Sequence, residues 1–402
     1  MKHLYVMQNS ILDYEWGSYT FIPELLGLDS PSLRPQAELW MGAHPKAPSM
    51  ICIDGTWTPL NSVLKSKSEF FLGKNAVQTY GLEIPYLVKV LSARKALSIQ
   101  AHPNKQFAEQ GFLKENLAQI PFNDPKRNYR DPNHKPECIC ALTDFYALCG
   151  FRKIETINNL ISELHIAEFV PILELLHHQN RALGLCHFFR AINQISGSNR
   201  KQLISKAIKS AKSLVHKDPC YSWILRLYED YPDDMGILAP LYLNWIHLQP
   251  TQALFLESGV VHAYLEGSGI EIMANSDNVL RCGITEKNKD IDELSRIVDF
   301  QEKEIDLFNV PLHNKNEYTY PVKAQEFVLS VINLDGNITV ERPMQRSLDI
   351  ILCTEGNASI SLVDIDESLD VHQGISILIP FAVNSYSIYG KATLYKVSVG
   401  SM

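Results

Sequence analysis

The stretch "ALSIQAHPNK" (residues 96–105) alternates apolar and polar residues before it reaches a proline. In a strand, successive side chains point to opposite faces. One face then carries Ala96, Ser98, Gln100 and His102, and the other carries Leu97, Ile99 and Ala101. A serine, a carboxamide and an imidazole in a row predict either a half-solvated strand or one wall of a metal site. Pro103 marks where the chain would leave that wall.

A second pair of polar residues precedes the apolar run in "NHKPECICALTDFYALCGF" (residues 133–151). Lys135 and Glu137 would share one strand face. Charged side chains are mostly exposed, so a solvated ion pair worth at most ~1 kcal/mol is one reading. The apolar residues that follow favour a strand that enters a packed barrel.

The segment "ESGVVHAYLEGSGIEIMANSDNVLRCGITEK" (residues 257–287) supplies further candidates. We expect His262 and Tyr264 to share a face, "EGSG" (residues 266–269) to turn the chain, and Glu271 and Met273 to share a face on the return strand. A lone histidine in such a hairpin is more often a hydrogen-bonded barrel residue than a ligand. "NSDN" (residues 275–278) is typical of a polar turn whose side chains cap their own backbone.

Two histidines, one carboxylate and one carboxamide on separate strands could converge inside one small barrel. Nitrogen and oxygen donors of this kind suit Zn²⁺ and other divalent metals. A neutral carboxamide ligand adds no negative charge, so the metal would remain a strong Lewis acid.

Length and charge limit the classes of protein. A chain of 402 residues predicts two or three domains. The net charge of -8 argues against nucleic-acid binding, while a small anionic ligand needs only a few converging cations. The eight cysteines form no CxxC pair, no signal-type segment opens the chain, and no apolar run approaches a membrane span. We therefore expect a cytoplasmic protein without a cysteine zinc site.

The pattern of apolar residues changes twice along the chain and divides it into three parts. Short apolar runs between Pro and Gly indicate β structure with loops up to about Arg152. Apolar residues then recur at helical spacing, as in residues 154–164 and 204–214, and "SGSN" (residues 196–199) predicts a break between two helices. Short strands return after Pro250, with turns expected at "LDGN", "TEGN" and "HQG". This final pattern favours an antiparallel barrel or jelly roll.

The remaining motifs do not indicate a function. "LEGSGIE" (residues 265–271) is no dinucleotide fingerprint, because no helix follows it, and the P-loop, GxSxG and HExxH patterns are absent. "KQLISKAIKSAKSLVHK" (residues 201–217) is typical of a helix with a solvated lysine face.

Four blocks together resemble the type I phosphomannose isomerases, zinc enzymes of the cupin superfamily. They are "AELWMGAHPKAPS" (37–49), "IPYLVKVLSARKALSIQAHPNK" (84–105), "NHKPECICALTDFYALCGFR" (133–152) and "VVHAYLEGSGIEIMANSDNVLRCGITEKNKD" (260–290), in the family's order. The pairing of "EIMANSDNVLR" with "SIQAHP" is the most specific part. The helical block and the C-terminal part resemble the family in position and texture more than in motif.

The resemblance implies a role for each matching position. One Zn²⁺ per chain would be held by Gln100, His102, Glu137 and His262. Arg281 matches the catalytic arginine, and Lys135 matches a lysine that is a candidate for proton transfer. The residues implied to line the substrate pocket are Trp16, Ser98, Tyr264, Glu271, Asp277 and Lys287. The chain departs from the family at Val261, where a proline is expected, and at Cys282, Ile284 and Glu286, without loss of a ligand.

The implied fold is mainly β, with two cupin or jelly-roll β domains and an α-helical insertion. We expect residues 1–152 to form the first part of the catalytic cupin domain, 153–250 the helical domain, 251–320 the second catalytic part, and 321–402 a C-terminal jelly roll without a metal site. The implied protein acts on a small sugar phosphate, binds neither nucleic acid nor membrane, and is a monomer.

The implied reaction interconverts mannose 6-phosphate and fructose 6-phosphate through an enediolate. A metal and an arginine would stabilise the developing oxygen charge. Lys135 is the first candidate for the base, and Glu271 or a metal-bound water are alternatives. Two other functions stay open: an iron cupin dioxygenase, which more often has three histidines and a carboxylate, and a cupin that binds sugar phosphate without catalysis.

Overall fold

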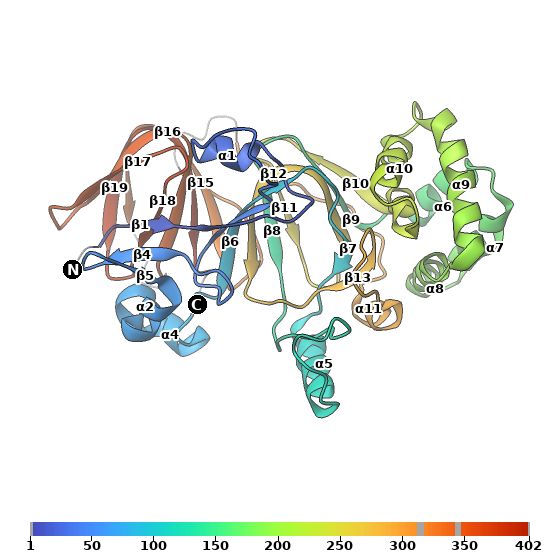
Figure 1. Ribbon diagram of the computed structural model, residues 1–402, viewed down its shortest axis with the longest axis horizontal. Helices are drawn as coiled ribbons and strands as arrows, with labels where there is room; N and C mark the ends of the chain where they lie inside the picture. The colour runs from blue at the N-terminus through green and yellow to red at the C-terminus, as the bar shows by residue number, and fades with distance from the viewer. Residues whose placement is uncertain (1–2, 312–316, 342–346, 401–402) are drawn as a thin grey trace.

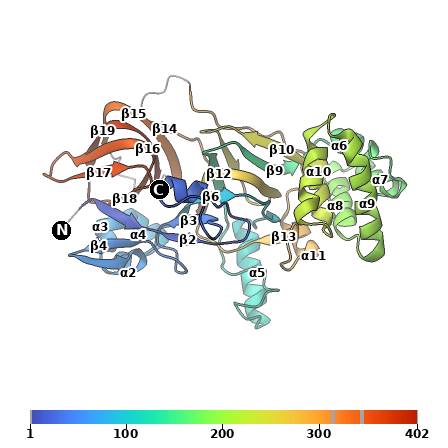
Figure 2. The same ribbon diagram turned by 45° about the horizontal axis from the view of Figure 1, so that its top comes forward.

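The protein consists of two antiparallel sheets and a helical part, arranged in a row (Figures 1 and 2). The structure is a computed structural model that describes residues 3–311, 317–341 and 347–400. The predicted fold class, mainly β with two cupin-like β parts and a helical insertion, is confirmed. No helix in these three ranges has the length and apolar character to span a membrane.

The central barrel is built from a ten-stranded sheet. Its path runs through β10 (Leu243–Leu248), β9 (Phe145–Phe151), β12 (His262–Ala274), β6 (Tyr86–Ala93), β3 (Glu38–Met41) and β2 (Ser10–Leu12). Four further strands pair beside it: β7 (Ile99–Ala101), β8 (Glu137–Ala141), β11 (Ala253–Leu256) and β13 (Leu280–Gly283). β12 pairs with β6, β7, β8 and β9, so one strand joins most of the barrel.

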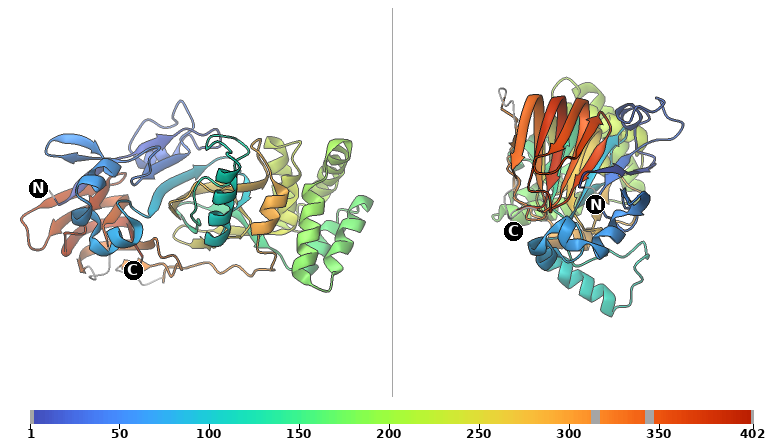
Figure 3. Two further views of the ribbon diagram at one scale, coloured as in Figure 1. Left: turned by 90° about the horizontal axis from the view of Figure 1, so that it is seen from below. Right: turned by 90° about the vertical axis from the view of Figure 1, so that its left-hand side faces the viewer.

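The second sheet combines C-terminal strands with the N-terminus of the chain. Its order is β14 (Glu317–Thr319), β15 (Val328–Glu341), β19 (Ser385–Ser398), β16 (Asp349–Leu362), β18 (Ser376–Ile379), β1 (Tyr5–Gln8), β4 (Met50–Ile53) and β5 (Thr56–Pro59), with β17 (Ser368–His372) on β16. Figure 3 shows both chain ends beside this sheet.

Asn9 lies where the chain passes from one sheet to the other, between β1 and β2. Its Nδ2 donates to Ser376 Oγ at 2.6 Å, and its Oδ1 accepts from Ser49 Oγ at 2.8 Å. The predicted four-part division stays a prediction, but the sheets cross its boundaries. β1, β4 and β5 come from the first part, and β14 comes from residues 251–320.

The helical part contains α6 (Ile154–Ser162), α7 (Val170–Glu174), α8 (Arg181–Asn193), α9 (Gly197–Leu214) and α10 (Pro219–Asp230), with 3-10 turns η1 (Ala167–Phe169), η2 (Leu175–His177) and η3 (Met235–Leu241). The two helical patterns and the break at "SGSN" are confirmed by α6, α8 and α9. The apolar faces of these helices share one core with Ile99, Ala101 and Leu148 of the barrel. The helices end at Leu241, and residues 243–248, expected inside the helical block, form β10 because they pair with β9.

The turn expected at residues 266–269 is wrong. β12 runs through it as one strand of 13 residues. The pairing with β9 shifts register between Tyr264 and Glu266, and Gly267 has a φ of 122°. A bulge and a glycine bend a strand without reversing it. A Cβ at Gly267 would also lie 2.5 Å from the carbonyl oxygen of Asp144.

Two of the three turns expected near the C-terminus are also wrong. "LDGN" (334–337) lies inside β15, and "TEGN" (354–357) lies inside β16. The β16–β19 register shifts between Cys353 and Glu355, so Gly356 belongs to a bulged strand. Only "HQG" (372–374) turns the chain, between β17 and β18.

Four helices interrupt the N-terminal segment that was expected to be β structure with loops. They are α2 (Leu60–Ser66), α3 (Ser68–Leu72), α4 (Lys74–Tyr80) and α5 (Lys105–Leu117), in addition to the short α1 (Phe21–Leu25). Asn104 caps α5 by accepting from the backbone N–H of Phe107. α5 therefore begins three residues after His102 and projects from the barrel (Figure 1).

Candidate metal and active site

Three side chains meet inside the barrel: His102, Glu137 and His262. One donor atom from each lies within 4.8 Å of the other two. His102 Nε2 is 3.3 Å from Glu137 Oε1, and His262 Nε2 is 3.4 Å from Glu137 Oε2. His102 directly follows β7, Glu137 begins β8 and His262 begins β12. Strand pairing therefore brings together residues that are far apart in the sequence.

Backbone carbonyls orient both imidazoles. His102 Nδ1 donates to the carbonyl oxygen of Asn278 at 2.7 Å, and His262 Nδ1 donates to that of Val260 at 2.9 Å. Both Nε2 lone pairs then point to Glu137. The two Nε2 atoms and Glu137 Oε2 are buried without a hydrogen-bond partner among the described residues. Buried polar atoms normally have partners, so these three atoms fit a cation placed between them.

The local charges keep these donors in the state that binds a cation. Burial alone would raise the pKa of Glu137, but Lys135 and the histidines outweigh it and hold the pKa well below its usual range. Lys135 Nζ lies 3.0 Å from Glu137 Oε1. Burial lowers the pKa of His102 to about 4. At neutral pH the carboxylate is therefore ionised and the His102 ring is neutral.

Gln100 lies beside these donors. Its Cα is in register with His262 of β12 and with Arg281 of β13. Its Oε1 accepts from Ser98 Oγ at 3.1 Å, so the two polar side chains lie on one side of the chain. Ile99 and Ala101 pack into the core shared with the helices, as strand alternation predicts.

The expected alternation fails at the start of this stretch. Ala96 packs with Ile99 and Ala101, and Leu97 packs toward the cluster that contains Tyr264. β7 begins only at Ile99, so residues 96 and 97 do not follow its alternation.

Sequence reasoning missed a buried group of charges next to the donors. Lys89 Nζ lies 2.8 Å from Glu271 Oε2 and 3.3 Å from Glu38 Oε1, and Trp40 Nε1 donates to Glu38 at 2.8 Å. Burial alone would lower the pKa of Lys89, but the two carboxylates raise it. A single lysine inside the otherwise apolar strand "YLVKVLSA" was the signal that could have found it.

Glu271 and Tyr264 both come from β12, rather than from the two strands of the expected hairpin, and both are buried. Burial raises the pKa of Glu271 in spite of the charge on Lys89. Burial, and then Glu271 and Glu137, raise the pKa of Tyr264. The half-buried Trp16 packs against the cluster that contains Tyr264.

Three cationic side chains, those of Arg281, Lys287 and Arg130, lie near one another at β13. Burial and then Arg130 lower the pKa of Arg281, and burial, Arg281 and Arg130 lower the pKa of Lys287. Within the described ranges neither side chain forms an ion pair or a side-chain hydrogen bond. Asp277, by contrast, is paired with Lys46 at 2.8 Å. Arg130 was not predicted, and nothing in the local pattern singles it out.

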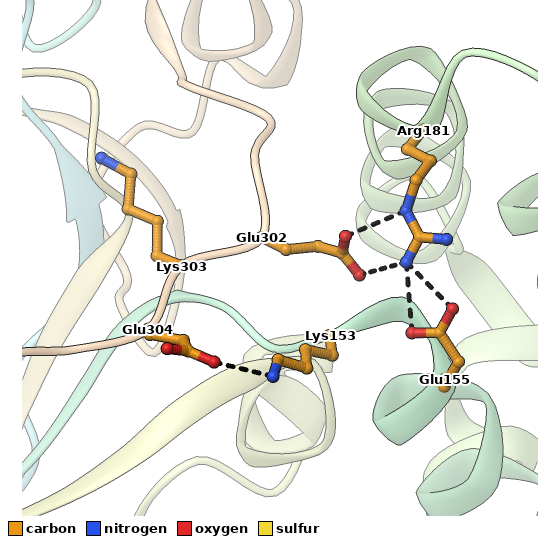
Figure 4. A pocket seen from close by; sticks show the side chains of 6 residues that line it. All are labelled: Lys153, Glu155, Arg181, Glu302, Lys303 and Glu304. Carbon is orange, nitrogen blue, oxygen red and sulfur yellow. Dashed lines mark hydrogen bonds and ion pairs between the residues drawn. The ribbon is translucent and has the colours of Figure 1, made fainter.

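A second polar pocket differs in kind (Figure 4). It lies between the helical part and the segment after α11 (Ile291–Ile297), and it is lined by Lys153, Glu155, Arg181, Glu302, Lys303 and Glu304. Arg181 pairs with Glu155 and Glu302, and Lys153 pairs with Glu304. Its carboxylates are all paired with Arg181 or Lys153, and Lys303 pairs with Glu257 and Asp299 outside it. In the described part of the chain, the barrel instead has donor atoms and cations without partners.

Comparison with known proteins agrees with this geometry. Residues 4–154 match the family described as "Phosphomannose isomerase type I, catalytic domain". The mannose-6-phosphate isomerase of Escherichia coli (strain K12) is 40% identical over 355 residues, which cover 88% of this chain and 89% of that protein. The mannose-6-phosphate isomerase of Rattus norvegicus is 31% identical over 395 residues and covers 90% of each.

Solved structures extend the likeness over the whole chain. A mutant of phosphomannose isomerase from Salmonella typhimurium superposes with a TM-score of 0.92 and 34% identity, over 99% of this chain and 100% of that one. A zinc-bound mannose 6-phosphate isomerase superposes with a TM-score of 0.89 and 35% identity, over 99% and 100%.

Proposed function

The chain belongs to the type I phosphomannose isomerase family, and we propose that it interconverts mannose 6-phosphate and fructose 6-phosphate through an enediolate. The observation that carries this proposal is the set of three buried donor atoms on His102, Glu137 and His262. These atoms have no hydrogen-bond partner among the described residues, and one donor atom from each residue lies within 4.8 Å of the other two.

These residues fit zinc. Two imidazole nitrogens, a carboxylate and the carboxamide of Gln100 form a nitrogen and oxygen donor set suited to one Zn²⁺ per chain. Bound there, zinc supplies a Lewis acid beside the sugar oxygens. The zinc-bound relative supports this choice of metal. We assign Gln100 as the fourth ligand, and its register with His262 supports this assignment.

The reaction moves a proton between C2 and C1 of the open-chain sugar. In the direction from mannose 6-phosphate, a base removes the C2 proton, and the electron pair forms the C1–C2 double bond as negative charge develops on O1. The O2 proton then moves to O1, and the protonated base returns its proton to C1 as the C2 carbonyl forms, which gives the ketose. Lys135 is our first candidate for the base because it is buried next to the proposed ligand Glu137, where a bound metal cation would favour the neutral amine. Glu271 is the alternative, since burial raises its pKa toward neutrality.

Arg281 and Lys287 would hold the negative charges of the substrate. Arg281 is half-buried and Lys287 is exposed. Neither has a carboxylate partner among the described residues, so both are free to form charge-assisted hydrogen bonds with an anion. We assign Arg281 to the developing oxyanion, and Lys287 with Ser98 to the phosphate. Arg130 adds a third positive charge to this end of the site.

The remaining predicted pocket residues would shape the sugar site. Tyr264 and Glu271 offer polar groups from one strand, Asp277 offers a carboxylate beside Lys46, and Trp16 offers an aromatic face. The substrate is a small molecule, and we propose a monomer in the cytoplasm. The eight cysteines are all unpaired, which suits a reducing compartment.

A coupled assay tests the proposal. Fructose 6-phosphate formed from mannose 6-phosphate is followed before chelation, after chelation and after zinc is added back. We expect turnover, its loss and its recovery. A protein that binds zinc but leaves mannose 6-phosphate unchanged would be a binding cupin. A protein that forms no fructose 6-phosphate and in which elemental analysis finds iron would point to the dioxygenase alternative.

A further inference from the structure

Asn278 is fully buried, and its side chain clamps a second loop rather than its own backbone. Its Oδ1 accepts from the backbone N–H groups of Arg130 at 2.6 Å and Asp131 at 3.2 Å. Its Nδ2 donates to the carbonyl oxygens of Asp131 at 2.7 Å and Asn133 at 2.9 Å. A carboxamide has two donor hydrogens and two acceptor sites, so Asn278 uses its full capacity on residues 130–133.

Asp131 completes the connection from the opposite loop. Its Oδ2 accepts from the backbone N–H of Asp277 at 2.7 Å, and its Oδ1 accepts from Ser276 Oγ at 2.9 Å. The two loops therefore hold each other through side chains on both sides. Ser276 in turn accepts from the backbone N–H of Asn278 at 3.2 Å.

The contacts of Asn278 connect it to two of the proposed metal donors, Glu137 and His102. The clamped loop ends at Asn133, and the chain then enters Lys135 and Glu137. The backbone carbonyl of Asn278 itself accepts from His102 Nδ1. One residue thus fixes the loop that leads to one donor and the ring orientation of another.

We propose that Asn278 is a positioning residue for the metal site, which sets His102 and Glu137 at the separation that a cation needs. This inference rests on the proposed zinc enzyme, because it concerns the same donors. Only an amide can serve here. A carboxylate could accept from the two N–H groups, but it would face the carbonyls of Asp131 and Asn133 without a proton to donate.

The test measures zinc affinity by competition with a chelator, together with urea unfolding of the metal-free protein. For Asn278→Ala we expect zinc affinity to fall roughly 10–100-fold, as for other residues that orient ligands. Asn278→Asp should weaken zinc binding at least as much. Asn9→Ala is the matched control, since Asn9 also clamps distant segments but touches no metal donor. It should lower stability and leave zinc affinity unchanged.

A double variant separates positioning from general destabilisation. If the two loops act as one clamp, Asn278→Ala combined with Asp131→Ala should weaken zinc binding little more than either change alone. If Asn278→Ala does not fold, Asp131→Asn tests the same clamp and should also weaken zinc binding. Parent-like zinc affinity in a folded variant at either position, or an equal loss in Asn9→Ala, overturns the inference. A parent protein that binds no zinc or does not isomerise the sugar would instead overturn the proposed function.

Discussion

Lys89 of β6 and Glu271 of β12 lie directly opposite each other, and their side chains form a buried ion pair of 2.8 Å. Glu38 shares the same ammonium at 3.3 Å. One positive charge thus keeps two carboxylates buried at the wall of the candidate site. The stability of the barrel therefore depends on the charge of Glu271, which is a predicted substrate contact.

Replacement of Lys89 by Met should destabilise the protein strongly. The variant leaves Glu38 and Glu271 buried without a counter-charge, and loss of one partner of a buried pair costs about 3–5 kcal/mol. Urea unfolding of the metal-free protein measures this change. Lys153→Met breaks the exposed pair with Glu304 and serves as the control, with an unchanged urea midpoint. Equal effects of the two substitutions would contradict the role of the buried pair.

Gln100→Ala should lower the zinc content of dialysed protein and reduce turnover. The substitution removes the neutral fourth donor and keeps the strand. Metal analysis and the coupled assay follow the two effects. Ser98→Ala is the neighbouring control for zinc content alone, because it removes the hydrogen bond to Gln100 but no proposed ligand. Its turnover is no control, since Ser98 is a proposed phosphate contact. Parent-like zinc content and turnover in Gln100→Ala would remove this residue from the ligand set.

Lys135→Met should reduce kcat by about 10²–10⁴-fold if Lys135 is the base, the range that general acid–base catalysis contributes. Zinc content must be measured in parallel, since Lys135 lies beside Glu137. Arg281→Ala should also abolish most turnover through loss of oxyanion stabilisation. If Lys135→Met turns over normally while Arg281→Ala is inactive, the base is another group, and Glu271→Gln becomes the next variant.

Arg130→Gln should raise KM for mannose 6-phosphate about tenfold with kcat little changed. A hydrogen bond to a charged group is worth about 1.5–3 kcal/mol. Arg130 lies near Lys287, the proposed phosphate contact, so we expect it to act on the phosphate rather than on the reacting carbons. Arg130→Lys keeps the charge and should restore part of the affinity. A fall in kcat at constant KM would place Arg130 closer to the chemistry than we propose.

The metal-free protein should lose stability as the pH falls from about 6.5 to about 4. His102 has its pKa lowered from 6.5 to about 4 by burial, so the unfolded chain binds its proton first. The free energy of unfolding therefore rises with pH through this window, by up to about 3 kcal/mol from this group. Glu137 acts in the same direction, because its pKa is lowered too. Urea unfolding at several pH values measures the slope, and His102→Gln should reduce it.

Local alternation was enough to group the donor residues but not to trace the strands. Gln100 and His102, and Lys135 and Glu137, lie two residues apart, and strand periodicity predicts their shared faces. The turn expected within residues 266–269 failed because a glycine can bend a strand as well as end it. Gly267 keeps β12 continuous, and its effect depends on the backbone of Asp144 across the sheet.

The buried polar partners could not be read from the sequence. Asn278 and Asp131 are far apart along the chain, and each looks like an ordinary turn residue in its own segment. Lys89 is a single charged residue in an otherwise apolar strand sequence. Its role as the counter-charge of Glu38 and Glu271 depends on two other strands. The resemblance to a family supplied the metal and the sugar, which neither spacing nor composition specifies.

The pairing of Tyr5 in β1 with Leu378 in β18 has a consequence for the synthesis of the chain on the ribosome. β1 is synthesised long before β18, so the edge of β1 that pairs with β18 has no hydrogen-bond partner from that strand until β18 has been synthesised. An unpaired edge is a site where chains aggregate. Nascent chains that stall between the two strands should therefore depend on chaperones, although most of the barrel is already complete.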